Sequence, residues 1–143
     1  MGNSWLYRNT VVNFLSDLPE NVEGFVYLIE HKETGEKYIG KKTFRFKKTR
    51  PPLKGKKRRR VTYVESDWRT YTGSSDVTKG WNPEDCIRTI LHICYNKTMM
   101  TYLEVREQFS RGVLESDEYL NDNILGKFYK KRIKKFIDDS RKN

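Results

Sequence analysis

Residues 41–60 have the composition to bind a polyanion. This segment, KKTFRFKKTRPPLKGKKRRR, contains twelve Lys or Arg and no acidic residue, and the whole chain has a formal net charge of +10. Phe44 and Phe46 lie among the basic residues, and sequence of ordered character flanks the segment on both sides. A solvated charged surface is the alternative, but basic residues interleaved with aromatic ones are typical of nucleic-acid binding. We therefore predict that the partner of this segment is a nucleic acid.

The residues before this segment predict a β-hairpin that carries two tyrosines. The run GFVYLIEH at 24–31 is β-branched and aromatic, the turn KETGEK has Thr34-Gly35 at its centre, and the run KYIGK follows. This pattern places Tyr27 and Tyr38 near each other on paired strands. Cross-strand packing would explain both tyrosines without any chemistry, so the hairpin alone leaves their role open.

The basic segment itself is broken by Pro51-Pro52 and Gly55. Because proline cannot donate to a strand ladder, we expect a protruding loop or a twisted β-arm rather than a central strand. The run RRRVTYV at 58–64 would be the return strand of such an arm.

Three further elements follow. The run CIRTILHICY at 86–95 is nearly all apolar and β-branched, which favours a buried strand, although a helix is compatible with it. Residues 98–112 have apolar side chains at helical spacing and end at Gly112, a natural C-cap, so we expect a helix with Glu104 in its middle. A basic amphipathic helix is expected over the later part of 119–137.

Length and composition limit the class of protein. A chain of 143 residues, 36% of them hydrophobic, is long enough for one compact domain. No run approaches the ~20 apolar residues that a membrane span needs. Cys86 and Cys94 lie outside any paired-cysteine motif, which favours a reducing compartment, and His31 and His92 form no cluster typical of zinc.

Taken together, four features resemble the GIY-YIG nuclease family. The tripeptide FVY ends at Tyr27 and YIG begins at Tyr38, with ten residues between them, and Phe-Val-Tyr stands where Gly-Ile-Tyr is usual. Two lysines follow directly, Glu104 lies on a predicted helix after a buried strand, and Asn121 lies further downstream. The run WRTYTGSS at 68–75, followed by YLEVREQF and then YLN, is similar to the stand-alone members of the family found in phage genomes.

The resemblance covers about residues 24–130 and implies an α+β fold. We expect a small mixed or antiparallel three-stranded sheet flanked by helices, with a basic β-arm or loop inserted after the first hairpin, at 41–66. In this interpretation residues 1–23 are a lead-in, and 24–143 form a single GIY-YIG-like nuclease domain.

The resemblance also implies roles at a catalytic site. Glu104 would be the ligand of Mg²⁺ or Mn²⁺, and Tyr27 and Tyr38 would orient or deprotonate the attacking water. Because an unperturbed tyrosine has a pKa of ~10, a nearby cation such as Lys41 or Lys42 would have to lower it. A solvent-facing helical glutamate is the alternative interpretation of Glu104.

Two further family positions are harder to place. Asn121 would hydrogen-bond near the phosphate or the glutamate-bearing helix, with Asn123 as alternate, although a capping role fits the NDN sequence equally well. The family also has an arginine about ten residues beyond the second motif, where this chain has Lys48. We predict that Arg45 takes this role, with Lys42 as a supporting cation. The other contenders are Arg50, Arg69 and Lys79.

These features predict a Mg²⁺-dependent DNA endonuclease of modest sequence preference, in the cytoplasm (of the host cell if phage-encoded) and without membrane association. The alternative is a non-catalytic nucleic-acid-binding protein that uses residues 41–60. Since one site cuts one strand, a double-strand break would need a homodimer or two visits. The residues expected to contact the DNA backbone are Lys41, Lys47, Lys48, Arg50, Lys56, Lys57, Arg58, Arg59, Arg60, Arg69 and Lys79.

Overall fold

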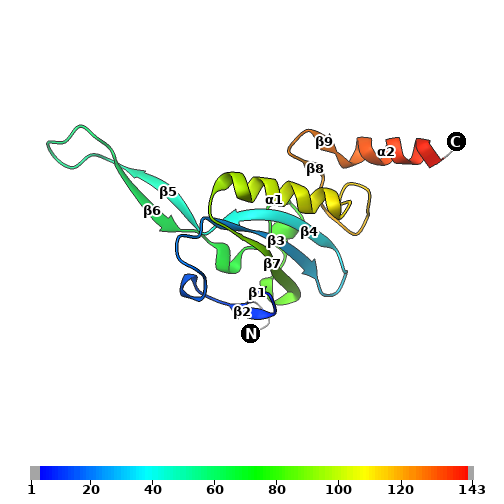
Figure 1. Cartoon of the computed structure of the whole chain (residues 1–143), viewed down its shortest axis with the longest axis horizontal. Helices are drawn as coiled ribbons and strands as arrows, with labels where there is room; N and C mark the ends of the chain where they lie inside the picture. The colour runs from blue at the N-terminus through cyan, green and yellow to red at the C-terminus, as the bar shows by residue number, and fades with distance from the viewer. Residues whose placement is uncertain (1–3, 142–143) are drawn as a thin grey trace.

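The structure, a computed structural model, describes residues 4–141 (Figure 1). Its strands are β1 (Trp5–Tyr7), β2 (Thr10–Val12), β3 (Gly24–His31), β4 (Lys37–Thr43), β5 (Arg45–Arg50), β6 (Arg60–Glu65), β7 (Cys86–Cys94), β8 (Asn123–Ile124) and β9 (Phe128–Tyr129). Its α-helices are α1 (Lys97–Ser110) and α2 (Lys130–Arg141). Single 3-10 turns lie at Leu15–Asp17, Trp68–Thr70, Thr78–Gly80 and Pro83–Asp85.

A mixed sheet of five strands, in the order β2-β1-β7-β3-β4, forms the body and confirms the α+β class. β1 runs parallel to β7, and the other neighbours are antiparallel. The sheet has two strands more than the three we expected, because residues 5–12 add β1 and β2 at one edge. Trp5 anchors this edge, since its buried indole packs edge-on against Phe25 at 4.9 Å. Three-residue strands are too short to give a periodic signal in the sequence.

The predicted hairpin is β3 and β4. Gly35 takes the turn position with φ +74°, which glycine adopts without strain, and its N–H donates to the His31 carbonyl at 2.9 Å. The pairing register places Tyr27 opposite Gly40 and Ile29 opposite Tyr38. Opposed residues share a face, so both tyrosines lie on the same side of the sheet.

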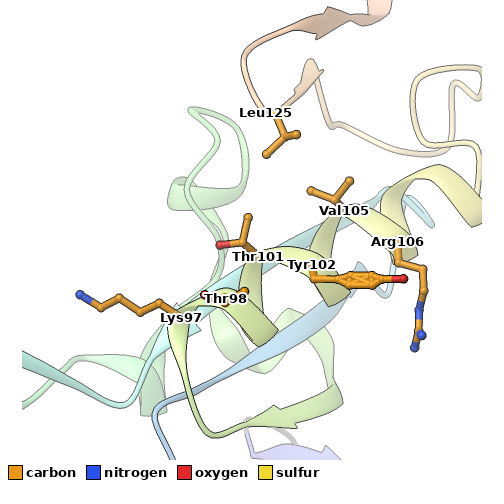
Figure 2. A pocket seen from close by; sticks show the side chains of 7 residues that line it. All are labelled: Lys97, Thr98, Thr101, Tyr102, Val105, Arg106 and Leu125. Carbon is orange, nitrogen blue, oxygen red and sulfur yellow. The ribbon is translucent and has the colours of Figure 1, made fainter.

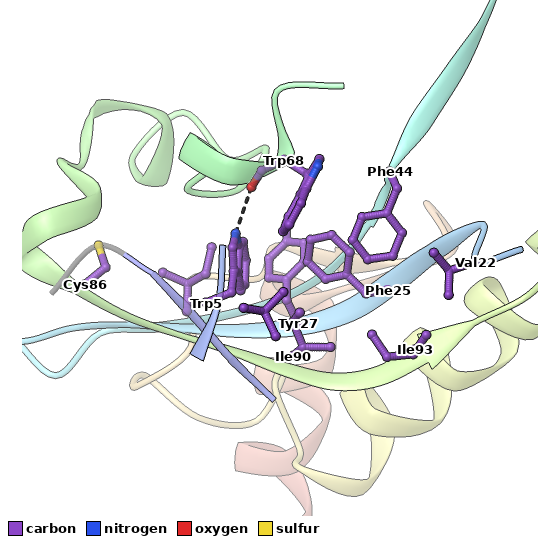
Figure 3. Packing of buried hydrophobic residues seen from close by; sticks show 11 residues of the cluster. Trp5, Val22, Phe25, Tyr27, Phe44, Trp68, Cys86, Ile90 and Ile93 are labelled. Atoms are coloured by element: carbon purple, nitrogen blue, oxygen red, sulfur yellow. Dashed lines mark hydrogen bonds between the residues drawn. The ribbon is translucent and has the colours of Figure 1, made fainter. Parts of the chain in front are cut away.

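Two hydrophobic cores cover the two faces of this sheet. On one face α1 packs against β3, β4 and β7, burying Val26, Ile39, Cys94 and Met100. On the other face lies an aromatic cluster that includes Tyr27 and Trp68, under the segment that joins β6 to β7 (Figure 3). The run at 86–95 is therefore a strand, β7, covered on both faces, which explains its near-continuous apolar sequence.

The basic segment forms the β-arm that its prolines and glycine predicted. Among the described strands, β5 and β6 pair only with each other, and they project from one end of the body (Figure 1). The base of the arm is fixed, because Phe44 and Trp68 pack perpendicular at 5.1 Å and the Ser66 hydroxyl donates to the Thr43 carbonyl at 2.6 Å. The arm is therefore a two-stranded ribbon whose base is fixed to the body and whose two faces are open to solvent.

The C-terminal helix α2 lies at the opposite end of the molecule from the arm (Figure 1). Lys134 pairs with Asp117, and Ile133 packs at the margin of the α1 core. Within residues 4–141, neither α-helix combines the length and the apolar character that crossing a membrane would require.

Candidate active site

Tyr38, Glu104 and Asn121 line one polar cavity of about 650 Å³. They come from the hairpin, from the middle of α1 and from the segment that follows α1, so only the fold brings them together. The cavity lies at the outer edge of β4, the last strand of the sheet. The other residues that line it are Ser74, Ser75, Asp76, Val77, Gln108, Leu120, Asp122, Asn123 and Leu125.

Asn121 holds this edge of the sheet. Its Nδ2 donates to the Ile39 carbonyl at 2.8 Å, and its Oδ1 accepts from the Ile39 N–H at 3.1 Å. The side chain thus pairs with β4 as a neighbouring strand would, and only 2% of it is exposed. Just before it, the Leu120 N–H donates to the Lys37 carbonyl at 2.7 Å. Asn121 therefore positions β4, while its alternate Asn123 accepts from the Gly126 N–H in a turn at 2.8 Å.

Glu104 is aimed at this edge by the helix that carries it. The Asn96 side chain accepts from the Met99 N–H at 2.7 Å and starts α1. One turn after Glu104, Gln108 donates to the Ile39 carbonyl at 3.1 Å and fixes the helix against β4. Burial raises the pKa of the Glu104 carboxyl, and the charge of Lys41 partly opposes that rise.

The two tyrosines have different environments. Tyr38 is partly buried in the cavity wall, and its hydroxyl shares a 2.9 Å hydrogen bond with Ser74 Oγ. Tyr27 is fully buried in the aromatic cluster, with its ring 6.3 Å from that of Tyr38. Burial raises the pKa of Tyr38 and, more strongly, that of Tyr27, and the nearby Tyr71 raises both. Both phenols are therefore neutral at physiological pH.

The expectation that Lys41 or Lys42 lowers a tyrosine pKa is wrong, because both ammonium groups are engaged elsewhere. Lys42 Nζ pairs with Asp67 at 2.6 Å and lies 4.1 Å from the centre of the Tyr71 ring. Lys41 extends to the α1 face of the sheet, where its Nζ donates to Thr101 Oγ1 at 2.7 Å. Desolvation consequently dominates at both phenols.

Gly40 is required by the packing of Tyr27. A Cβ at position 40 would contact the Tyr27 hydroxyl and lie 2.6 Å from its Cζ. The Tyr27 ring has little room to retreat, since Trp5 and Tyr71 pack against it at 5.7 and 5.8 Å. The glycine of YIG thus allows a buried tyrosine to cross the adjacent strand.

We expect Gly40→Ala to lower the free energy of unfolding by about 1–3 kcal/mol, because an extra methyl group overpacks a closed core. Urea denaturation would measure the change. Gly80→Ala is the matched control, because a Cβ there meets no atom within 4 Å, and its stability should stay within about 0.5 kcal/mol of wild type. Equal stability of the two variants would contradict this packing.

The structure does not bring Arg45 into the cavity. β5 leaves the sheet after Phe44, and Arg45 borders a separate hollow with Glu23 and Tyr63. Arg69 pairs with Glu65 at 3.3 Å at the base of the arm. Among the described residues, the cavity lining contains no Lys or Arg. The remaining basic residues expected to bind DNA on the arm are exposed, namely Lys47, Lys48, Arg50, Lys56, Lys57, Arg58, Arg59 and Arg60.

Several cavity residues were missed from the sequence. Ser74 and Asp76 come from the loop TGSSD, and Asp122 directly follows Asn121. The negative charge of Asp122 contributes to the raised pKa of Tyr38. Ser, Asp and Gly are common turn residues, so no pattern in the sequence singled these positions out. The one hint was the run LNDN at 120–123, which places Asp122 next to the predicted site residue Asn121.

The donor set suits a hard divalent cation that keeps most of its water. Among residues 4–141 no three His, Cys, Asp or Glu side chains cluster closely enough to hold a metal by themselves. Mg²⁺ needs only one or two carboxylates in addition to water and phosphate oxygens. Glu104 supplies a desolvated carboxylate, and Asp122 and Asp76 supply further oxygens around the same cavity. These residues therefore fit such an ion.

A tyrosine-bearing hairpin at the edge of a mixed sheet, with a glutamate on the helix that packs across it, is the arrangement of the GIY-YIG nuclease class. The family model described as "Putative endonuclease segE, GIY-YIG domain" matches residues 5–124. The chain belongs to this GIY-YIG family, and the family is one of nucleases. Comparison with curated proteins and with solved structures finds no match.

Proposed function

We propose that the protein is a Mg²⁺-dependent (or Mn²⁺-dependent) DNA endonuclease that hydrolyses phosphodiester bonds. The observation that carries the proposal is the convergence of Tyr38 and Glu104 in one polar cavity beside the fixed edge of β4. A binding protein would need neither a desolvated carboxylate nor a buried tyrosine at this place. Family membership supports the same reaction class.

Each residue then has a distinct role. Glu104 would hold the metal, which when bound polarises a phosphate oxygen and lowers the pKa of a water. Tyr38, a neutral phenol fixed by Ser74, would orient the attacking water by a hydrogen bond. Asn121 acts through β4 as a positioning residue. Tyr27 supports the ring of Tyr38 from the core.

We assign the positive charge near the metal to Lys41 in place of the family arginine. Its charge acts on the Glu104 carboxyl, whereas Arg45 lies outside the cavity. Lys42 would be a supporting cation behind Tyr71, held there by Asp67.

The arm would supply most of the affinity for DNA. Residues 45–65 contain ten Lys or Arg and one acidic residue, Glu65. The Glu65 carboxylate lies at the base of the arm, where it accepts a hydrogen bond from Trp68 Nε1 at 2.9 Å. A two-stranded ribbon fits the major groove of B-DNA, and basic side chains on both of its faces can reach phosphates. Arg69 and Lys79 would extend this contact toward the body.

One catalytic site cuts one strand, so we expect nicked DNA. A double-strand break would need a homodimer or two successive binding events by one protein molecule. By family expectation the products carry a 5′-phosphate and a 3′-hydroxyl. Cys86 and Cys94 are buried free thiols, which fits a reducing compartment, and we place the activity in the cytoplasm. For a phage-encoded enzyme this would be the host cell's cytoplasm.

Incubation of supercoiled plasmid with Mg²⁺, Mn²⁺, Ca²⁺ or EDTA tests the proposal. We expect relaxed circles first with Mg²⁺ or Mn²⁺ and none with EDTA. Plasmid that stays intact under every metal and salt condition, but is retarded on a gel, would instead support a non-catalytic nucleic-acid-binding protein.

A further inference from the structure

A second groove adjoins the candidate active cavity. It has a volume of about 740 Å³ and lies between the outer surface of α1 and the turn that joins β8 to β9 (Figure 2). Leu125 lines both this groove and the Glu104 cavity, so the two hollows border the same side chain. The groove is lined by Lys97, Thr98, Thr101, Tyr102, Val105, Arg106 and Leu125.

Leu125 has an unusual backbone for its side chain. Its φ is +59° and that of Gly126 is +65°, and the Lys127 N–H closes the turn on the Ile124 carbonyl at 3.1 Å. A turn with two left-handed central residues favours Asn, Asp or Gly at the first of them. A branched residue is strained there, and strained positions cluster at functional sites.

Burial does not explain the choice of leucine. The side chain of Leu125 is 53% exposed, whereas its neighbour Ile124 is 1% exposed and supplies the core contact of this turn. Figure 2 shows Leu125 directed across the groove toward α1 and Val105. The strained turn therefore holds an apolar side chain at the junction of the groove and the cavity.

The opposite wall has the chemistry of a base-stacking site. Tyr102 is 57% exposed, and the guanidinium carbon of Arg106 lies 5.9 Å from the centre of its ring. Lys97 and Arg106 place positive charge at the two ends of the α1 wall, and Thr98, Thr101, Tyr102 and Val105 lie between them. Exposed aromatic rings flanked by cations are how proteins bind unpaired bases and their phosphates.

Resting on the proposed function, we infer that this groove receives an unstacked nucleobase of the DNA strand, next to the scissile phosphate. Leu125 packs against the unstacked base from one side of the groove, and Tyr102 stacks on it from α1. Lys97 and Arg106 contact the phosphates on either side. Because Glu104 lies on the same turns of α1 as Tyr102 and Val105, a base in the groove places its phosphate at the adjoining cavity.

Equilibrium binding to two fluorescent duplexes, one fully paired and one with a single unpaired nucleotide, tests this inference in EDTA. An unpaired nucleotide already avoids the cost of unstacking, so we expect wild type to bind that duplex about tenfold more tightly. Tyr102→Ala and Leu125→Gly should each reduce the preference to about twofold or less. Leu125→Gly suits the positive φ and should fold at least as well as wild type.

Tyr95→Ala is the matched control, because this half-exposed tyrosine lies outside the groove, and it should keep the tenfold preference. Equal binding of the two duplexes by wild type would overturn the inference, as would a preference that survives both groove variants. Because no cleavage is needed, these outcomes are independent of the plasmid assay. A failed nuclease proposal would show as intact plasmid beside a normal preference.

Discussion

Glu104→Gln is expected to lower the rate of plasmid nicking by about 10³-fold or more. Glutamine keeps the shape of the side chain and removes the negative charge that would bind the metal. Glu104 is a desolvated carboxylate that lines the same cavity as Tyr38 and Asn121. Single-turnover nicking of supercoiled plasmid with saturating enzyme would measure the rate without a contribution from weaker binding.

The same substitution should not destabilise the protein. Burial raises the pKa of Glu104 above its ordinary value of 4.5, so ionising this carboxyl costs more in the folded state than in the unfolded one. This cost is absent at pH values below the unfolded pKa and grows as the pH rises through the folded pKa. At neutral pH Glu104→Gln should therefore melt at the same temperature as wild type or higher, and in acid the difference should vanish.

Glu107→Gln is the matched control on the same helix. Glu107 accepts from Arg111 Nε at 2.9 Å and lies 2.8 Å from His92 Nε2, and these partners lower its pKa. Its loss should reduce stability at neutral pH while nicking is retained. If the two variants gave the reverse pattern, with activity lost at Glu107 and kept at Glu104, the metal ligand would be misassigned.

Neutralising the arm is expected to have the second-largest effect, on affinity for DNA. Replacement of Lys57, Arg58 and Arg59 by glutamine removes three charges from its exposed tip. If each contacts a phosphate, the slope of log K against log salt should become less steep by about 0.9 per contact. The affinity for duplex DNA at physiological salt should fall by about 100-fold. Fluorescence anisotropy over a range of salt concentrations would give both quantities.

A second triple variant separates the position of charge from its amount. Lys131, Arg132 and Lys135 of α2 are also exposed and basic, at the other end of the molecule from the arm. Their replacement by glutamine changes the net charge equally and should leave the salt slope nearly unchanged. Equal losses from the two variants would show that the arm makes no specific contribution.

The sequence predicted the elements that have strong local signals. The hairpin follows from the β-branched and aromatic run at 24–31 and the turn at Gly35. The helix α1 follows from its apolar spacing and from Gly112, which ends it with φ +60°. The arm follows from prolines and glycine inside a basic run. These are short-range properties, and propensity and turn chemistry decide them without help from the rest of the chain.

Features that depend on long-range contacts could not be predicted. β1 and β2 are strands because Trp5 is buried beneath Trp68, to whose carbonyl its Nε1 donates at 2.8 Å (Figure 3). The sequence left Asn121 open between a cap and a role near the phosphate, whereas both polar atoms of its amide pair with β4 across 82 positions of sequence. The raised pKa values of Tyr27 and Tyr38 arise from burial, which depends on how the whole chain packs.

The central claim is that the metal and the scissile phosphate meet in the cavity of Tyr38 and Glu104. Anomalous diffraction from a crystal of the protein grown with Mn²⁺ and a short DNA duplex tests it most directly. We expect an anomalous peak within coordination distance of the Glu104 carboxylate, with a backbone phosphate beside it. A bound duplex whose Mn²⁺ lies elsewhere, with Glu104 touching neither metal nor phosphate, would contradict the claim.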